Sequence, residues 1–183
     1  MVYTKEESEK IVGFLASVLT DFIQSEVRVR SLTRTLVDSI DCYTRNNEVF
    51  LNGNRNVRWF NWGDLCKLKR RNGLLEEFPH ISNDAYEVLS AAERGINIPK
   101  VPKRLICDHV MPVKAIDEHL RNSQYHDPAD TLGFLNNHYR RCIITTDENK
   151  LLDKDLKSKM PSDWKSAASP FVRYEKVGIK LKR

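Results

Sequence analysis

Apolar side chains recur along much of the chain at the spacing of an amphipathic helix. Over residues 5–24 they follow the period of about 3.6 residues that is typical of a helix buried on one face. Thr4 precedes this stretch and Glu7 lies three positions later, which is the pattern of a capping box. Similar patterns predict further helices over residues 27–44, 59–69, 85–94, 114–122, 128–139 and 148–157.

Two short runs have the composition of β-strands instead. Residues 104–109 form an apolar run that ends in polar side chains, and residues 141–146 are rich in β-branched side chains. Thr146 or Asp147 can cap the helix expected directly after the second run. The pattern therefore predicts an α+β protein, mainly helical, with a small core of two strands and a helix in its C-terminal half.

The proline-interrupted stretch from Ile98 to Lys103 divides the chain in two. We expect a helical region over residues 1–97. Residues 98–183 should hold both strands, a helical insertion between them and a basic tail.

The charge of the chain changes sign along its length. The 183 residues carry a net charge of +5, with net charges of −2 over residues 1–53, +4 over 54–104, −3 over 105–149 and +6 over 150–183. Acidic side chains that could hold a metal are thus flanked by cations that could hold phosphates. A solvated charge pattern without function explains the same numbers equally well.

Hydropathy and cysteine spacing narrow the class of protein. The sequence has no apolar stretch long enough to span a membrane, and its N-terminal residues are charged where a signal peptide needs an apolar core, so we expect a cytoplasmic protein with no membrane partner. The cysteines stand singly without a CxxC pair, which favours buried thiols over a scattered zinc site. They are Cys42, Cys66, Cys107 and Cys142.

The dipeptide Asp108-His109 alone is weak evidence for a functional site, but the predicted elements around it strengthen that evidence. The pair ends the first strand-like run, Pro112 follows, and residues 142–149 supply a strand and a helix start downstream. Phosphodiester hydrolysis needs a base, and an imidazole can accept a proton at neutral pH. It also needs a cation at the phosphate, for which carboxylate and amide oxygens are suitable hard ligands.

Asp-His-Val-Met-Pro followed by Ile-Thr-Thr-Asp-Glu-Asn-Lys resembles the motif of the HNH, or ββα-metal, endonuclease family, in the variant with Asn in place of the last His. The resemblance covers about residues 104–157. It implies that His109 is the general base and that Asp108 and Asn149 bind a divalent metal. Mg²⁺ is the expected ion, with Mn²⁺ as the alternative, and no small-molecule cofactor is implied.

The middle position of the family motif is not matched, because Arg140 stands where the family often has Asn. Asn137 is the candidate for the middle catalytic role, with His138 as the alternative, and both could instead cap or end the preceding helix. Glu148 could be a further metal ligand, although a carboxylate in the first turn of a helix is favourable without any metal.

Basic residues after Asn149 are the candidate DNA surface, namely Lys150, Lys154, Lys157, Lys159 and Arg173. A second basic cluster, Lys67, Lys69, Arg70 and Arg71, lies beside Trp59 and Trp62. Either cluster could equally be a solvated face. The apolar tail from Pro170 to Ile179 should pack on the core.

Together these residues favour a prokaryotic or phage DNA endonuclease of the restriction type. Such an enzyme acts on double-stranded DNA, and cutting both strands at one sequence favours a homodimer. The region 1–97 would then serve DNA recognition or dimerisation. The competing hypotheses are a non-catalytic, basic nucleic-acid-binding protein, in which Asp108 and His109 are structural, and a protein-interaction domain that is merely basic.

Overall fold

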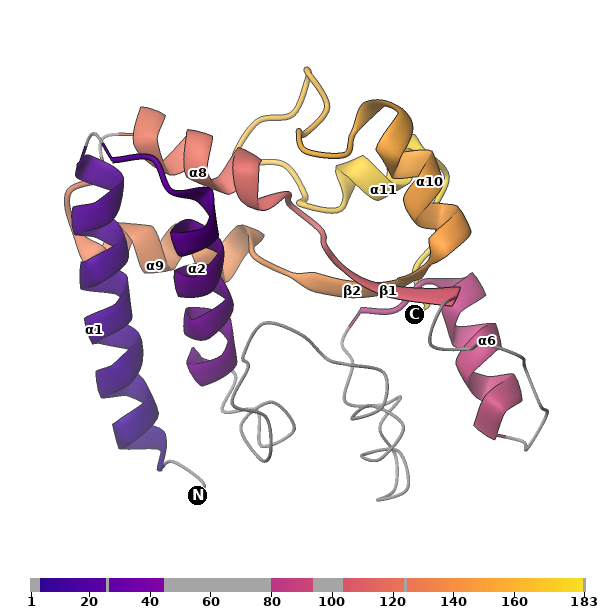
Figure 1. Cartoon of the computed structure of the whole chain (residues 1–183), viewed down its shortest axis with the longest axis horizontal. Helices are drawn as coiled ribbons and strands as arrows, with labels where there is room; N and C mark the ends of the chain where they lie inside the picture. The colour runs from indigo at the N-terminus through magenta and orange to yellow at the C-terminus, as the bar shows by residue number, and fades with distance from the viewer. Residues whose placement is uncertain (1–3, 26, 45–79, 94–103, 124, 183) are drawn as a thin grey trace. The chain divides into compact units, whose positions relative to one another are not determined.

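The computed structural model describes residues 4–25, 27–44, 80–93, 104–123 and 125–182. Within these ranges it combines helices with a two-stranded antiparallel sheet, which confirms the α+β class in general. The expected helix at residues 59–69 and the basic cluster near it lie outside the described residues. The elements are α1 Lys5–Gln24, α2 Arg30–Thr44, α6 Asn83–Glu93, β1 Leu105–His109, α8 Val113–Asn122, α9 Pro128–His138, β2 Arg141–Thr145, α10 Thr146–Asp155 and α11 Val172–Lys176 (Figure 1).

The described elements form two compact units that do not follow the expected boundary between residues 97 and 98. The first unit contains α1, α2, α8 and α9, and the second contains α6, β1, β2, α10 and α11. The difference arises because the insertion between the two strands packs on the N-terminal helices, whereas α6 packs on β2.

The first unit is held by the apolar faces predicted from the helical period. Thr4 accepts a hydrogen bond from the Glu7 amide at 3.2 Å, and the Glu7 carboxylate accepts one from the Thr4 amide at 2.8 Å, which confirms the capping box. Helix α1 packs against α2, α8 and α9. A hydrogen bond of 2.9 Å between the buried hydroxyls of Thr20 and Thr131 joins α1 to α9.

Arg121 of α8 closes the C-terminal end of α1. Its guanidinium donates hydrogen bonds of 2.9 Å to the carbonyl oxygens of Ile23, Ser25 and Val27. It also pairs with Asp117, one turn earlier in α8, at 3.2 Å. Ile23 lies in the last turn of α1, where carbonyls lack a partner within the helix, and a cation there also meets the negative end of the helix dipole.

His119 of α8 gives the first unit a stability that depends on pH. Its ring stacks on Phe134 with centroids 4.4 Å apart, and burial lowers the pKa of His119 below the ordinary 6.5. The folded protein therefore binds fewer protons than the unfolded chain near and below this pH, so its stability should fall as the pH is lowered through that range. We expect His119→Phe, which keeps an aromatic ring, to reduce the slope of the urea midpoint against pH.

The control for this measurement is His126, which is exposed at the start of the segment leading to α9. His126→Gln should leave the slope as it is in the unmodified protein. Equal slopes for all three proteins would show that His119 does not carry the pH dependence.

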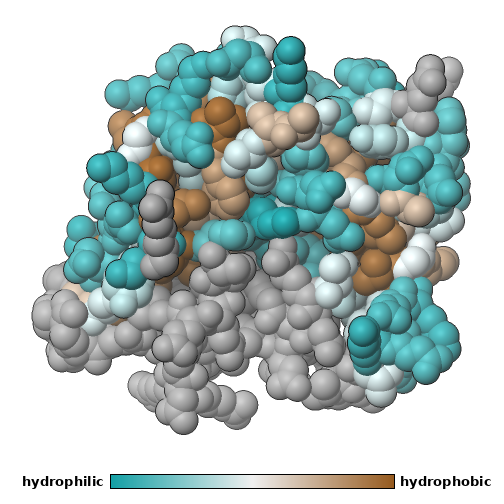
Figure 2. All heavy atoms as spheres, turned by 180° about the vertical axis from the view of Figure 1, so that it is seen from behind, coloured by the Kyte–Doolittle hydropathy of each residue, from teal (hydrophilic) through white to brown (hydrophobic). Residues whose placement is uncertain are grey.

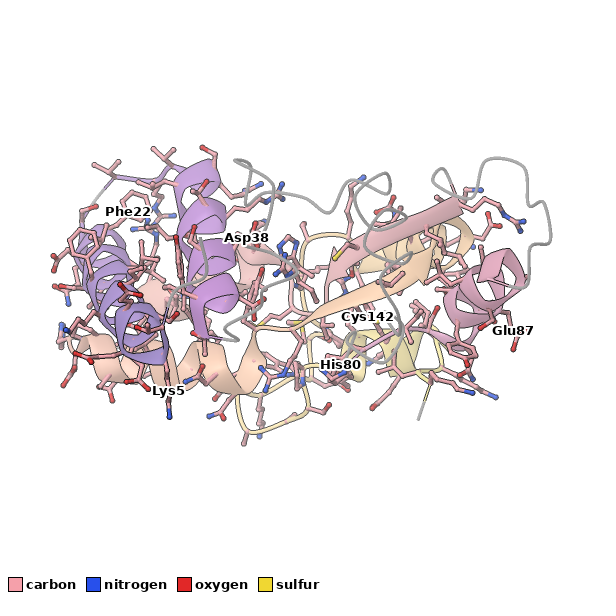
Figure 3. The ribbon with its side chains drawn as sticks, turned by 90° about the horizontal axis from the view of Figure 1, so that it is seen from below. Lys5, Phe22, Asp38, His80, Glu87 and Cys142 are labelled. Atoms are coloured by element: carbon pink, nitrogen blue, oxygen red, sulfur yellow. The ribbon has the colours of Figure 1, made fainter. Side chains whose placement is uncertain are left out.

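The second unit is built around the strand pair. The register runs from Leu105 opposite Thr145 to His109 opposite Arg141. Residues before α6 add to the outer edge of β2 through backbone hydrogen bonds. The Ser82 amide donates to the carbonyl oxygen of Ile143 at 2.9 Å, and the Ile143 amide donates to the carbonyl oxygen of His80 at 3.1 Å. Three of the labelled residues in Figure 3, His80, Glu87 and Cys142, belong to this unit.

The core of the second unit draws on the strands, α10 and the C-terminal tail. Its buried members are Val110, Cys142, Ile144, Leu152, Tyr174 and Ile179. Tyr174 and Ile179 belong to the tail, which confirms that the apolar tail packs on the core. Cys107 and Cys142 are free thiols; Cys142 is buried as expected, whereas Cys107 is only partly buried. Cys66 lies outside the described residues.

None of the helices that the structure describes is long and apolar enough to cross a membrane. On the face shown in Figure 2, hydrophilic side chains cover much of the described surface, and smaller apolar areas show between them.

Candidate functional site

Asp108 and His109 are the last two residues of β1, as the sequence pattern predicted. Neighbouring side chains of a strand point to opposite faces, so the two side chains do not share a face. Asp108 stands opposite Cys142 across the strand pair, and His109 stands opposite Arg141. Because Cys142 belongs to the core of the second unit, Asp108 faces the core side of the sheet and His109 faces the other side.

Asp108 is held by two side chains of the C-terminal tail. Arg173 donates a hydrogen bond from Nη2 to the Oδ2 atom of Asp108 and forms an ion pair with it. The hydroxyl of Tyr174 donates to the same Oδ2 atom at 2.8 Å. Among the described residues, Oδ1 accepts no side-chain hydrogen bond. Burial raises the pKa of Asp108, and the Arg173 charge and the Tyr174 hydrogen bond oppose that shift.

The expected place of Arg173 on the DNA surface is wrong. Its side chain is only 2% exposed, and its guanidinium is turned inward to Asp108. The physical reason is charge compensation, because a carboxylate with 19% of its side chain exposed needs a counter-ion close by. Sequence reasoning also missed Tyr174 as a partner of Asp108. The apolar tail signalled that this segment is packed, but no local spacing links residues 66 positions apart.

Asn149 lies in the first turn of α10, the helix that directly follows β2 and packs against both strands. Its Nδ2 atom donates a hydrogen bond of 3.2 Å to Asp153 one turn later. With the amide group held in this way, its carbonyl oxygen takes no hydrogen bond from the described residues. Asp108, His109 and Asn149 thus all belong to the second unit.

Glu148 holds the start of α10 through one of its carboxylate oxygens. Its Oε2 atom accepts hydrogen bonds from the Ser82 hydroxyl at 2.7 Å, from the Thr145 amide at 2.7 Å and from the Thr145 hydroxyl at 3.0 Å. The N-cap of α10 is therefore Thr145, which precedes the expected Thr146 or Asp147 by one or two positions. These bonds support the structural explanation of Glu148 over a role as metal ligand.

Removing the Glu148 carboxylate should destabilise the second unit. Glu148→Ala would leave the buried Ser82 hydroxyl and the Thr145 amide without this acceptor, at a cost of about 1–3 kcal/mol in the free energy of unfolding. Glu148→Gln is the matched control, because glutamine serves in the same capping box and should cost less. Urea denaturation of both variants gives the comparison, and equal stabilities would contradict the capping role.

Asn137 and His138, the candidates for the middle catalytic role, belong to the first unit, unlike the other candidates. Asn137 is exposed near the end of α9. His138 is buried, and its ring lies against Phe134 with centroids 4.7 Å apart. This packing favours the helix-end explanation for His138.

The four candidate lysines lie on or just after α10, and all are exposed. Lys150 pairs with Asp147 at 2.7 Å, and Lys157 pairs with Asp153 at 3.7 Å. Both pairs are at the surface, where solvent screens them and such contacts exchange readily. Lys154 and Lys159 are the remaining members of this set. The four ammonium groups are thus accessible to a phosphate backbone.

A divalent cation would have few protein ligands here. In the part of the chain that the structure describes, no three side chains of the His, Cys, Asp and Glu types gather as a metal site. The Oδ1 atom of Asp108 and the carbonyl oxygen of Asn149 remain as hard oxygen donors. Mg²⁺ commonly binds through one or two protein ligands and keeps several waters, so the chemistry of these two oxygen donors is compatible with it.

Comparison of the chain with protein-family models, with curated proteins and with solved structures gave no match.

Proposed function

We propose that the protein is a metal-dependent DNA endonuclease with an HNH-like site in its second unit. The order of elements is the observation that supports this most. Asp108 and His109 end β1, and Asn149 lies in the first turn of the helix that directly follows the paired strand β2. This is the order in which the ββα-metal motif carries its base and its two metal ligands.

His109 would accept the proton of the attacking water, while Asp108 and Asn149 would hold the cation. A bound Mg²⁺ supplies positive charge to the scissile phosphate and the leaving oxygen. Since only two protein ligands are engaged, positions remain for water and for phosphate oxygens. The opposite orientations of Asp108 and His109 keep the base from competing for the metal.

The substrate would be double-stranded DNA, cut by an enzyme of the restriction type that acts as a homodimer, one site per strand. Lys150, Lys154, Lys157 and Lys159 would contact the phosphate backbone next to the site. Because such contacts release counter-ions, DNA binding should weaken steeply with salt.

A second candidate function is non-catalytic nucleic-acid binding. The observation that favours it is the ion pair between Asp108 and Arg173, which gives the Asp-His pair a structural explanation. In this case the exposed lysines alone would bind the polyanion. Binding would be sensitive to salt, independent of metal and without product.

Incubation of supercoiled plasmid with the protein in Mg²⁺, Mn²⁺ or EDTA tests both candidates. The endonuclease should convert the plasmid to nicked or linear forms with either metal and leave it intact in EDTA. A shift in mobility without cleavage under all three conditions would support the binding protein. Neither cleavage nor binding at low salt would reject both.

A further inference from the structure

The two oxygens of the Asp108 carboxylate differ in their hydrogen bonds. Arg173 and Tyr174 both donate to Oδ2, the backbone amide of His109 also hydrogen-bonds to the carboxylate, and no described side chain donates to Oδ1. Arg173 is only 2% exposed, so its charge is screened little by solvent. A cation bound at Oδ1 would therefore meet a carboxylate that is already neutralised by a fixed guanidinium.

Two like charges that share one carboxylate oppose each other. At the separation imposed by a single carboxylate, the repulsion between a guanidinium and a divalent ion remains large at the effective dielectric of a partly buried site. The guanidinium also fixes the plane of the carboxylate, because hydrogen bonds to a charged group are short and directional. The pair thus affects both the affinity for a cation and the way in which Asp108 can bind it.

From this geometry we infer that Arg173 is a positioning residue that limits Asp108 to one metal-binding oxygen and keeps the site's affinity for divalent cations low. In the metal-free protein the guanidinium takes the place of the cation as the counter-charge of Asp108. The inference rests on the proposed function, since it concerns the same metal site. It predicts that removing the charge of Arg173 raises the affinity of the site for metal ions. Damage to the fold would lower that affinity instead, so the two effects can be told apart.

Terbium is a suitable probe, because Tb³⁺ binds oxygen ligands and emits when a nearby tyrosine is excited. The Tyr174 hydroxyl lies 2.8 Å from Oδ2 of Asp108, so an ion on this carboxylate would be sensitised. The 183-residue protein is titrated with Tb³⁺, and Mg²⁺ is then used to displace it. The double variant Asp108→Asn with Arg173→Met, which removes both charges of the ion pair, identifies the emission that belongs to this carboxylate.

Arg173→Met and Arg173→Gln should bind Tb³⁺ and Mg²⁺ about tenfold more tightly or better, because both lack the opposing charge. Arg173→Lys keeps the charge and should stay close to the unmodified protein. In EDTA the neutral variants should melt at lower temperature, and added Mg²⁺ should restore part of the loss. Arg173→Gln retains a hydrogen-bond donor for Asp108, so it carries the test if Arg173→Met does not fold.

Folded Arg173→Met and Arg173→Gln variants that bind the ions no more tightly than the unmodified protein would overturn the inference. If neither variant folds in EDTA, Tb³⁺ must restore folding, and failure to do so would overturn it as well. Unmodified protein that binds neither ion and cuts no plasmid would reject the proposed function itself. Metal binding and cleavage with unchanged affinity in the neutral variants would reject only the role of Arg173.

Discussion

His109→Ala should abolish the Mg²⁺-dependent cleavage of plasmid DNA while the protein remains folded. In the proposed mechanism, His109 removes a proton from water at the moment of attack, and loss of a general base costs about 10²–10⁴-fold in rate. The side chain stands at the end of β1 on the face away from the core, so its truncation leaves the packing around Cys142 and Tyr174 unchanged. Cleavage is measured by gel, and folding by circular dichroism.

His126→Ala is the matched control, because it removes an exposed histidine of the first unit. Its cleavage rate should equal that of the unmodified protein. Undiminished cleavage by His109→Ala would reject His109 as the base and, with it, the HNH-like site.

Asp108→Asn should lower the free energy of unfolding by about 3 kcal/mol, because it leaves the buried Arg173 without its counter-charge. Loss of activity in this variant alone would therefore not identify a metal ligand. In the double variant Asp108→Asn with Arg173→Met, both charges are gone, and much of the stability should return. If Asp108 binds the metal, the double variant should be stable and still inactive.

Asp163→Asn is the control for stability, because Asp163 forms an exposed ion pair with Lys176 and its removal should change the unfolding midpoint little. Urea denaturation in EDTA compares all four proteins. Equal stability of Asp108→Asn and Asp163→Asn would show that the ion pair with Arg173 does not support the fold.

Local sequence patterns predicted the elements well, since the interactions that end and begin them are themselves local. The capping box of Thr4 and Glu7 joins residues three positions apart, and the polar end of β1 is visible in its own five residues. The local errors are small: the N-cap of α10 is Thr145 rather than the adjacent Thr146, and α2 begins at Arg30 rather than at residue 27.

Interactions between distant segments could not be predicted in the same way. A basic residue in a charged tail is usually solvated, so nothing in the sequence near Arg173 indicates that it is buried against Asp108. Likewise, the proline-interrupted stretch at residues 98–103 suggested a domain boundary. The composition of each unit depends instead on which apolar helix and strand faces pack together. The amphipathic faces of α8 and α9 were visible, but their partners in α1 and α2 were not.

The insertion of α8 and α9 between β1 and β2 affects the order in which the chain can assemble. The strands are joined through residues 110–140 rather than by a short turn, so pairing them closes a loop whose entropic cost grows with its length. Contacts of this sequence separation slow folding. Prior assembly of α8 and α9 with the N-terminal helices would shorten the effective loop, so the strand pair that carries Asp108 and His109 is expected to form late, after the helices of the other unit.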